Sequence, residues 1–87
     1  MHEIRYLTYT SRKSEKGILK DCGAIADREG DHKGQIKRIR FSNLVKKNYV
    51  EAVDWIEKND NGWYDNLAVK FKEGRRVMWL VKIEYHC

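Results

Sequence analysis

The sequence contains no proline, only two cysteines and no apolar run long enough to cross a bilayer. The absence of proline and the presence of only six glycines exclude collagen-like, proline-rich and low-complexity chains. A membrane-spanning helix needs about 20 apolar residues in succession, and residues 1–5 lack the apolar core of a secretory signal. We therefore expect a cytoplasmic protein that does not engage a membrane.

Cys22 and Cys87 are too few for the disulfide framework of a small secreted protein. One disulfide between them is the alternative, but the expected compartment favours two free thiols, with Cys22 buried in a structural role. No two of the cysteines and histidines have zinc-ligand spacing, no complete catalytic set is present, and a chain of this size leaves little volume for a deep cleft. We expect no enzyme activity, no metal and no cofactor.

The chain has 87 residues, of which 41% are hydrophobic and 36% charged. These values predict one compact domain over residues 1–87, because so short a chain seldom divides its apolar residues between two cores. A chain of this length buries only about 60 to 65% of its unfolded surface, so the stability margin should be narrow.

Residues 67–85 carry the clearest strand pattern. Apolar residues alternate from Leu67 to Phe71, Glu73 and Gly74 interrupt the run, and a second alternating run extends from Val77 to Tyr85. This pattern predicts a hairpin whose second strand lies inside the sheet, because that strand is apolar on both faces.

The clearest helix pattern begins after Asn48, a good N-cap residue with a glutamate three positions later. Apolar residues at positions 49, 52, 53 and 56 form one face, and residues 59–62 form a stop rich in asparagine and glycine. A start at Ser42 is the alternative.

The remaining patterns are weaker. Residues 3–10, 18–26 and 35–41 are interpreted as strands, the second with a bulge near Gly23, and residues 27–34 as a solvated loop. The sequence thus predicts an α+β fold, a mainly antiparallel four- or five-stranded sheet packed on one helix in the order β-β-β-α-β-β. The expected core consists of Ile4, Tyr6, Ile18, Ile36, Ile39, Phe41, Ala52, Val53, Ile56, Leu67, Val69, Phe71, Val77, Trp79, Val81 and Ile83.

Charge is unevenly distributed along the chain. Residues 49–65 hold five acids and one base, a net charge of −4, whereas the rest holds 17 bases and eight acids, a net charge of +9. Residues 33–47 contain six bases and no acid. If folding gathers these cations on one surface, that surface attracts a polyanion; the alternative is that they only keep the strands soluble.

The first functional hypothesis is a small binding protein whose basic face engages nucleic acid without sequence specificity. The candidate binding residues are Lys33, Lys37, Arg38, Arg40, Lys46, Lys47, Arg75 and Arg76. Trp63, Tyr64 and Tyr9 are candidates for stacking on bases. For Trp63 and Tyr64, however, the sequence favours a structural role in which they close the core over the helix end.

The second hypothesis is a protein-binding inhibitor of the type found in phages and mobile elements, directed for example at a host defence nuclease. It would present Glu51, Asp54, Glu57 and Asp60 as a mimic of phosphate charge, or its basic face to an acidic partner. A homodimer, formed through the edge of the first strand or through a leftover apolar face, is a third hypothesis.

Overall fold

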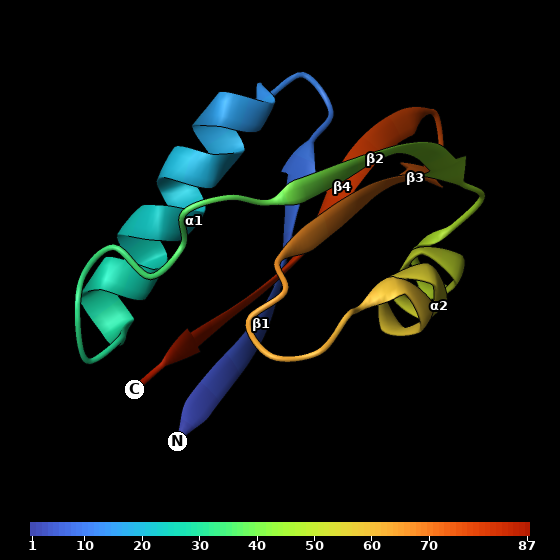
Figure 1. Ribbon diagram of the computed structural model, residues 1–87. Coiled ribbons are helices and arrows are strands. Elements are labelled where there is room, and N and C mark those ends of the chain that lie inside the picture. Colours follow the sequence, from blue (N-terminus) through green and yellow to red (C-terminus); the bar gives the residue numbers. More distant parts are fainter.

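The computed structural model describes residues 1–87 as four strands and two helices (Figure 1). In chain order these are β1 (His2–Thr10), α1 (Glu15–Glu29), β2 (Arg40–Lys46), α2 (Tyr49–Asn59), β3 (Leu67–Glu73) and β4 (Arg76–His86). The sheet has the order β1-β4-β3-β2. Strand β4 is antiparallel to β1 and β3, and β2 is parallel to β3. The α+β class is confirmed, but the expected single helix, mainly antiparallel sheet and element order are wrong.

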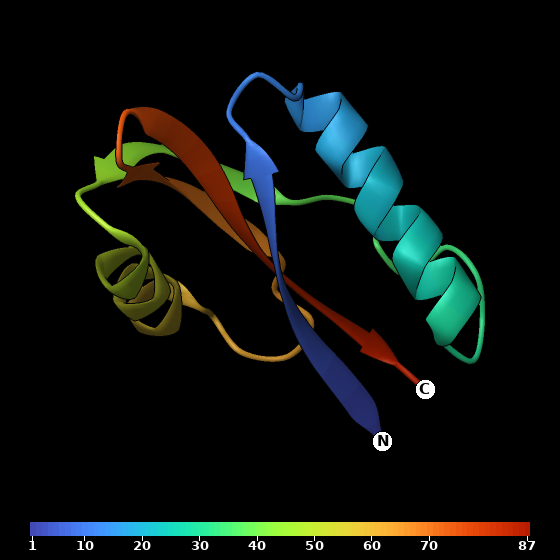
Figure 2. The same ribbon diagram turned by 180° about the vertical axis from the view of Figure 1, so that it is seen from behind.

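The two helices lie on opposite faces of the sheet, as the two views in Figures 1 and 2 agree. Helix α1 connects β1 at one edge to β2 at the other edge, and α2 connects β2 back to the neighbouring β3. Crossovers between parallel strands are nearly always right-handed. Two crossovers of the same hand that travel in opposite directions across a sheet must use opposite faces, which accounts for the three layers.

Helix α1 replaces the strand expected at residues 18–26. The Ser14 side chain caps the helix by accepting a hydrogen bond from Gly17 N at 3.0 Å. Ile18, Cys22 and Ala26 then follow at helical spacing and are all fully buried. These three residues are spaced four apart, so they lie on one face of the helix, and that face packs against the sheet.

Helix α2 begins where the sequence predicts. The Asn48 side chain accepts a hydrogen bond from Glu51 N at 2.9 Å, and the helix ends at Asn59. The alternative start at Ser42 is wrong, because Ser42 lies within β2. Ala52 and Ile56 are fully buried, so the predicted apolar face is the one that packs on the sheet.

The β3–β4 hairpin is confirmed, and β4 is a central strand as predicted. Gly74 has a φ of 61° at the turn, a left-handed conformation that glycine adopts without steric cost. Successive residues of β4 point to opposite faces, so Trp79, Val81 and Ile83 meet α1 while Leu80 meets α2. Each face therefore has its own core cluster.

The strand expected at residues 35–41 is mostly wrong, because β2 begins only at Arg40. Residues before it run as an extended segment without strand pairing, yet Ile36 and Ile39 are both buried against α1 and the sheet. Burial of these two side chains holds the segment in place and leaves the residues between them in solvent.

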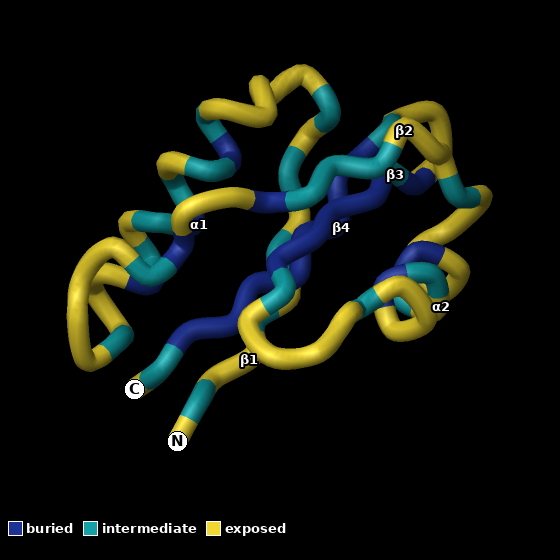
Figure 3. Tube along the Cα trace, in the orientation of Figure 1, coloured by how far each residue is buried: buried dark blue, intermediate teal, exposed yellow.

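Two expected core residues lie on the surface. Ile4 is 49% exposed and Tyr6 is 39% exposed, because α2 covers β3 and leaves the same face of β1 open. The exposed stretch of β1 beside the buried β4 is visible in Figure 3. Phe41, Val53 and Val77 are half-buried, and the other expected core residues are buried. Both cysteines are free thiols, with Cys22 buried and Cys87 exposed, as predicted.

Candidate functional site

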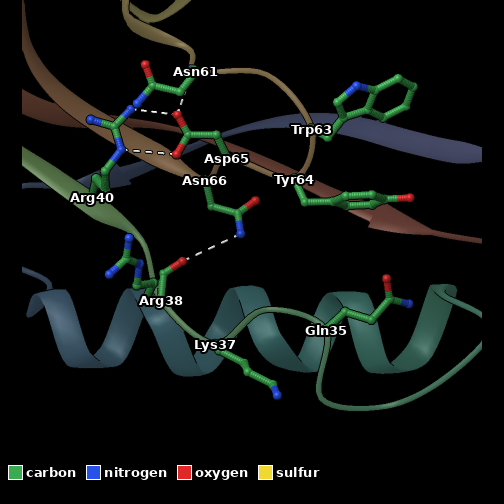
Figure 4. Close-up of a pocket in the computed structure, with 9 residues that line it drawn as sticks. All are labelled: Gln35, Lys37, Arg38, Arg40, Asn61, Trp63, Tyr64, Asp65 and Asn66. Carbon is green, nitrogen blue, oxygen red and sulfur yellow. Dashed lines mark hydrogen bonds and ion pairs between the residues drawn. The ribbon is translucent and has the colours of Figure 1, made fainter.

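A polar groove of about 390 Å³ opens between the extended segment before β2 and the loop after α2 (Figure 4). The segment supplies one wall and the loop supplies the other. The lining residues are Gln35, Lys37, Arg38, Arg40, Asn61, Trp63, Tyr64, Asp65 and Asn66. The two walls thus combine cations, amides and two aromatic rings.

The first wall is fixed by buried neighbours on both sides of its cations. Lys37 and Arg38 are exposed between the buried Ile36 and Ile39. Gln35 anchors the start of the segment, because its amide nitrogen donates to His86 O at 2.9 Å and its oxygen accepts from His86 N at 2.6 Å. Neither Lys37 nor Arg38 forms an ion pair, so both charges are free to meet an anion.

Arg40 joins the two walls. Its guanidinium donates to both carboxylate oxygens of Asp65, from Nε at 3.0 Å and from the terminal nitrogen at 2.6 Å, and also to Asn59 O at 3.0 Å. These bonds hold the pKa of the Asp65 carboxyl below its usual value, against the opposing effect of burial, and raise the pKa of Arg40. Arg40 is therefore a structural clamp more than a free cation.

A buried lysine holds the second wall from beneath. Lys82 is 1% exposed, and its Nζ donates to Asp60 Oδ2 at 2.9 Å, to Asp65 O at 2.5 Å and to Glu84 Oε1 at 3.4 Å. Glu84 is itself 5% exposed and also pairs with His2 at 3.0 Å. The loop is thus attached to the central strand by charges that have little access to water.

Trp63 and Tyr64 lie in the middle of this loop, with their rings on the surface. Trp63 is 79% exposed and Tyr64 is 42% exposed, so the expectation that they close the core is wrong. Tyr64 has a φ of 58°, a left-handed conformation that is uncommon for a residue with a side chain. Its N–H donates to Glu84 Oε1 at 3.2 Å, which helps to hold this conformation. The Trp63 ring lies 5.2 Å from the His2 ring.

A second cavity of about 690 Å³ continues the groove, because both are lined by Gln35, Lys37 and Tyr64. Asp31, His32, Lys33, Gly34 and His86 complete its lining. The Asp31 carboxylate accepts hydrogen bonds from Nδ1 of His32 and from Nδ1 of His86, each at 2.6 Å. These two bonds hold the pKa of the Asp31 carboxyl below its usual value. Lys33 forms no ion pair, so it adds a third free cation to this side of the molecule.

The other predicted cations lie at the opposite end of the sheet. Because β2 runs parallel to β3, Lys46 and Lys47 emerge beside the β3–β4 hairpin that carries Arg75 and Arg76. Strand β2 has seven residues, so the two ends lie roughly 20 Å apart. Arg75 and Arg76 line a separate cavity with Arg12, and Lys47 lies 3.5 Å from Glu51. The structure therefore brings only Lys33, Lys37, Arg38 and Arg40 together around the groove.

Three of the four candidate acids on α2 and at its C-cap form ion pairs with lysines. Glu51 pairs with Lys47, Asp54 pairs with Lys58 at 3.0 Å, and Asp60 pairs with Lys82. Glu57 is exposed and forms no ion pair. The candidate stacking residue Tyr9 also has local partners, because its hydroxyl donates to Asp21 and the ring lies half-buried beside α1.

Comparisons with protein families, with curated proteins and with solved structures find no match to this chain. Neither helix has the length and apolar character required to cross a membrane.

The sequence analysis missed Lys82 and Glu84, which hold the loop, and Asn66, whose Oδ1 accepts a hydrogen bond from Glu84 N at 2.9 Å. Lys82 and Glu84 alternate with apolar residues in β4, a pattern that normally places charges in solvent. Their position on an otherwise apolar central strand was the available signal, because a charged residue on a doubly covered strand must find a buried partner.

Proposed function

We propose that the protein binds single-stranded nucleic acid without sequence specificity in this groove. The observation that carries the proposal is that two exposed aromatic rings line the same groove as two unpaired cations, on walls held by buried side chains. Lys37 and Arg38 contact phosphates, while Trp63 and Tyr64 stack on bases. Stacking suits every base, because each has a π-face, so the site tolerates any sequence.

The backbone of Tyr64 supports this assignment. A residue held in a sparsely populated conformation costs about 1–3 kcal/mol and persists only where its surroundings impose it. Glu84 and Lys82 supply those surroundings here. A tyrosine fixed with its ring half in solvent, next to a tryptophan that is even more exposed, stabilises no core. Ligand contact explains why such a costly arrangement is present.

The second cavity extends the proposed path. A strand that stacks on Tyr64 can continue past Lys37 towards Lys33, because the two cavities share that wall. Each phosphate of a single strand that the protein neutralises contributes about −0.7 to the slope of the logarithm of the binding constant against the logarithm of the salt concentration. Three free cations along the path therefore predict a slope of about −2. This is a binding activity without a chemical step, so it needs no cofactor and no enzyme chemistry.

A salt titration tests the proposal. Binding of a fluorescein-labelled, mixed-sequence oligonucleotide is followed by anisotropy at several salt concentrations. The double variant Lys37→Gln/Arg38→Gln should bind more weakly, with a slope smaller by about 1.4. The matched control, Arg75→Gln/Arg76→Gln, removes the same charge at the far end of the sheet and should keep the slope. No binding at about 50 mM salt, or equal loss in the control, would remove the proposal.

The stacking contribution has its own test. Trp63→Ala should weaken binding by about 1–3 kcal/mol, the usual contribution of one stacked base. Val50→Ala removes another exposed apolar side chain, 73% exposed, from α2 and serves as the control. Trp63→Phe keeps an aromatic face and should retain most of the affinity.

The inhibitor hypothesis receives less support, because lysines occupy three of the four acids that would mimic phosphate. It makes the opposite prediction for charge reversal. Glu51→Lys with Asp54→Lys should abolish capture of a protein partner under that hypothesis, whereas oligonucleotide binding in the groove should persist or increase. A homodimer is a separate proposal, because it concerns the free edge of β1.

A further inference from the structure

The two outer strands of the sheet differ in how well their free edges are protected. The pairing of β2 with β3 shifts register between Phe41 and Val45, whereas nine residues of β1 pair with β4 without a shift. Proteins usually blunt an edge with a bulge, a lysine or a proline. β1 has none of these, although the chain holds 18 lysines and arginines. Its single base, Arg5, pairs with Glu29 at 2.8 Å.

The backbone of β1 leaves hydrogen-bonding groups unpaired along this edge. Met1 O accepts from Cys87 N at 3.0 Å, and Ser11 N donates to Val77 O at 3.0 Å. Met1 and Ser11 are odd-numbered and flank β1, so the alternation of an antiparallel ladder directs the odd-numbered residues of β1 to β4. Ile4, Tyr6 and Thr8 therefore direct their N–H and C=O groups away from the sheet.

The same three residues also have exposed side chains. They lie on the face that α2 leaves open, and Ile4 and Tyr6 are half-exposed apolar groups there. The free edge thus presents unpaired backbone and apolar side chains together, with no charge on that face of the strand between Ile4 and Thr8.

We propose that β1 pairs with β1 of a second copy of this chain, antiparallel, around a two-fold axis at Tyr6. In this register Ile4 lies opposite Thr8 of the partner subunit, and Arg5 lies opposite Leu7 of the partner subunit. All nine residues overlap, and the outward N–H and C=O groups of the even-numbered residues face one another. A shift of the axis to Arg5 would instead oppose two arginines, which destabilises a strand pair.

The expected interface is small. A nine-residue strand is about 30 Å long, so a strip about 15 Å wide buries on the order of 900 Å² on the two partners together. Specific interfaces usually exceed about 1,000 Å² in total, so we expect a weak dimer with a dissociation constant in the micromolar range.

A second copy is the partner that the observations favour over a foreign strand. Each copy brings an identical free edge, so one pairing event covers two unprotected edges at once. The outer edges of the resulting eight-stranded sheet are both β2, which is the interrupted strand. Cyclic two-fold dimers are also the commonest closed assemblies of soluble proteins.

The test is the mass of the full chain in solution across concentrations. Sedimentation velocity from about 1 µM to about 1 mM should show a shift from 10.4 kDa towards twice that mass. Tyr6→Lys places two cations together on the axis and should keep the protein monomeric over this range. Val50→Lys adds the same charge at an exposed position of α2 and should dimerise like the parent.

Two further variants test the pairing of the two β1 strands without adding charge. Thr8→Pro removes an N–H that bonds nothing within the chain, so it should abolish the dimer while circular dichroism and the melting temperature stay close to those of the parent. In a Cys87→Ser background, Tyr6→Cys should form a disulfide-linked dimer and Val50→Cys should not. Monomeric mass at every concentration, or a dimer that survives both Tyr6→Lys and Thr8→Pro, would overturn the proposal.

Discussion

Replacing Lys82 with methionine should destabilise the protein by about 3 kcal/mol, because it breaks a buried ion pair while leaving the acids behind. The Lys82 ammonium is 1% exposed and has three oxygen partners, of which Glu84 is 5% exposed. Removing one member of such a pair usually costs about 3–5 kcal/mol. We expect a cost at the lower end of this range, because the Asp60 side chain is 26% exposed and its carboxylate can be solvated once the lysine is removed.

This loss is large against a total unfolding free energy of about 5–15 kcal/mol for a domain of ordinary stability. Urea denaturation followed by circular dichroism measures it directly, as a lower midpoint at an unchanged slope. Glu84→Gln in the Lys82→Met background removes the buried carboxylate charge that has lost its lysine, so this double variant should recover more than about 1 kcal/mol.

Lys58→Met is the matched control for this prediction. Lys58 forms an ion pair with Asp54 at 3.0 Å, but its side chain is 73% exposed, so its loss should cost less than about 0.5 kcal/mol. If Lys82→Met costs no more than Lys58→Met, the buried network does not hold the loop and the reasoning fails. Stability that is unchanged by Glu84→Gln in the double variant would refute the assignment of the penalty to the stranded carboxylate.

Three further predictions follow from burial and charge. Ile56→Ala should cost about 2–5 kcal/mol in a urea titration because the side chain is fully buried, whereas Ile4→Ala should cost less than about 1 kcal/mol. Burial raises the pKa of the Cys22 thiol, so a thiol reagent at neutral pH should label the exposed Cys87 first and Cys22 only on unfolding; equal rates would contradict its burial. The folded pKa of Asp65 lies below its usual value of 3.8, so its contribution to stability is complete above that pH and is lost as pH falls through the folded pKa; Asp65→Asn should flatten this part of an acid titration.

The parts of the fold that the sequence predicts are those determined by local pattern. The hairpin and α2 each combine a periodic apolar run with a residue that stops or caps it, and both are correct. The strand expected at residues 18–26 is wrong, because its weak and interrupted apolar pattern was interpreted as a bulged strand. Ile18, Cys22 and Ala26 fit a period of four, and Ser14 precedes them as an N-cap. The signal was present, but the glycine and aspartate within the segment favoured a bulged strand.

Other errors come from long-range packing that no local pattern contains. Ile4 and Tyr6 fit a half-buried strand, yet they are exposed because α2 packs over β3 on that face. The parallel pairing of β2 with β3 depends on α2, which crosses between the two strands and was itself predicted. The formation of α1 in place of a strand also changes the order of elements along the chain and leaves four strands in the sheet.

The candidate site was predicted in composition but not in position. Lys37 and Arg38 were expected to act with Arg75 and Arg76, and the chain places the two pairs at opposite ends of the sheet. Arg40 was expected to be a free cation and is instead bonded to Asp65. The sequence shows which charged residues the chain contains. The fold determines which of them pair with an acid and which remain exposed without a partner.

Two regions of the molecule carry clustered cations, the groove and the β3–β4 hairpin. Residues in unusual environments distinguish the groove from the hairpin as a candidate binding site. At the groove, a lysine is buried, a tyrosine has a positive φ and a tryptophan is exposed, all within one connected network. Foldable sequences usually satisfy local preferences, and they depart from them where function requires a particular geometry. The hairpin end has arginines but none of these departures: its glycine turn is relaxed and its side chains stand in solvent. We therefore place the proposed binding site in the groove, where the chain accepts conformational cost, and not at the hairpin end.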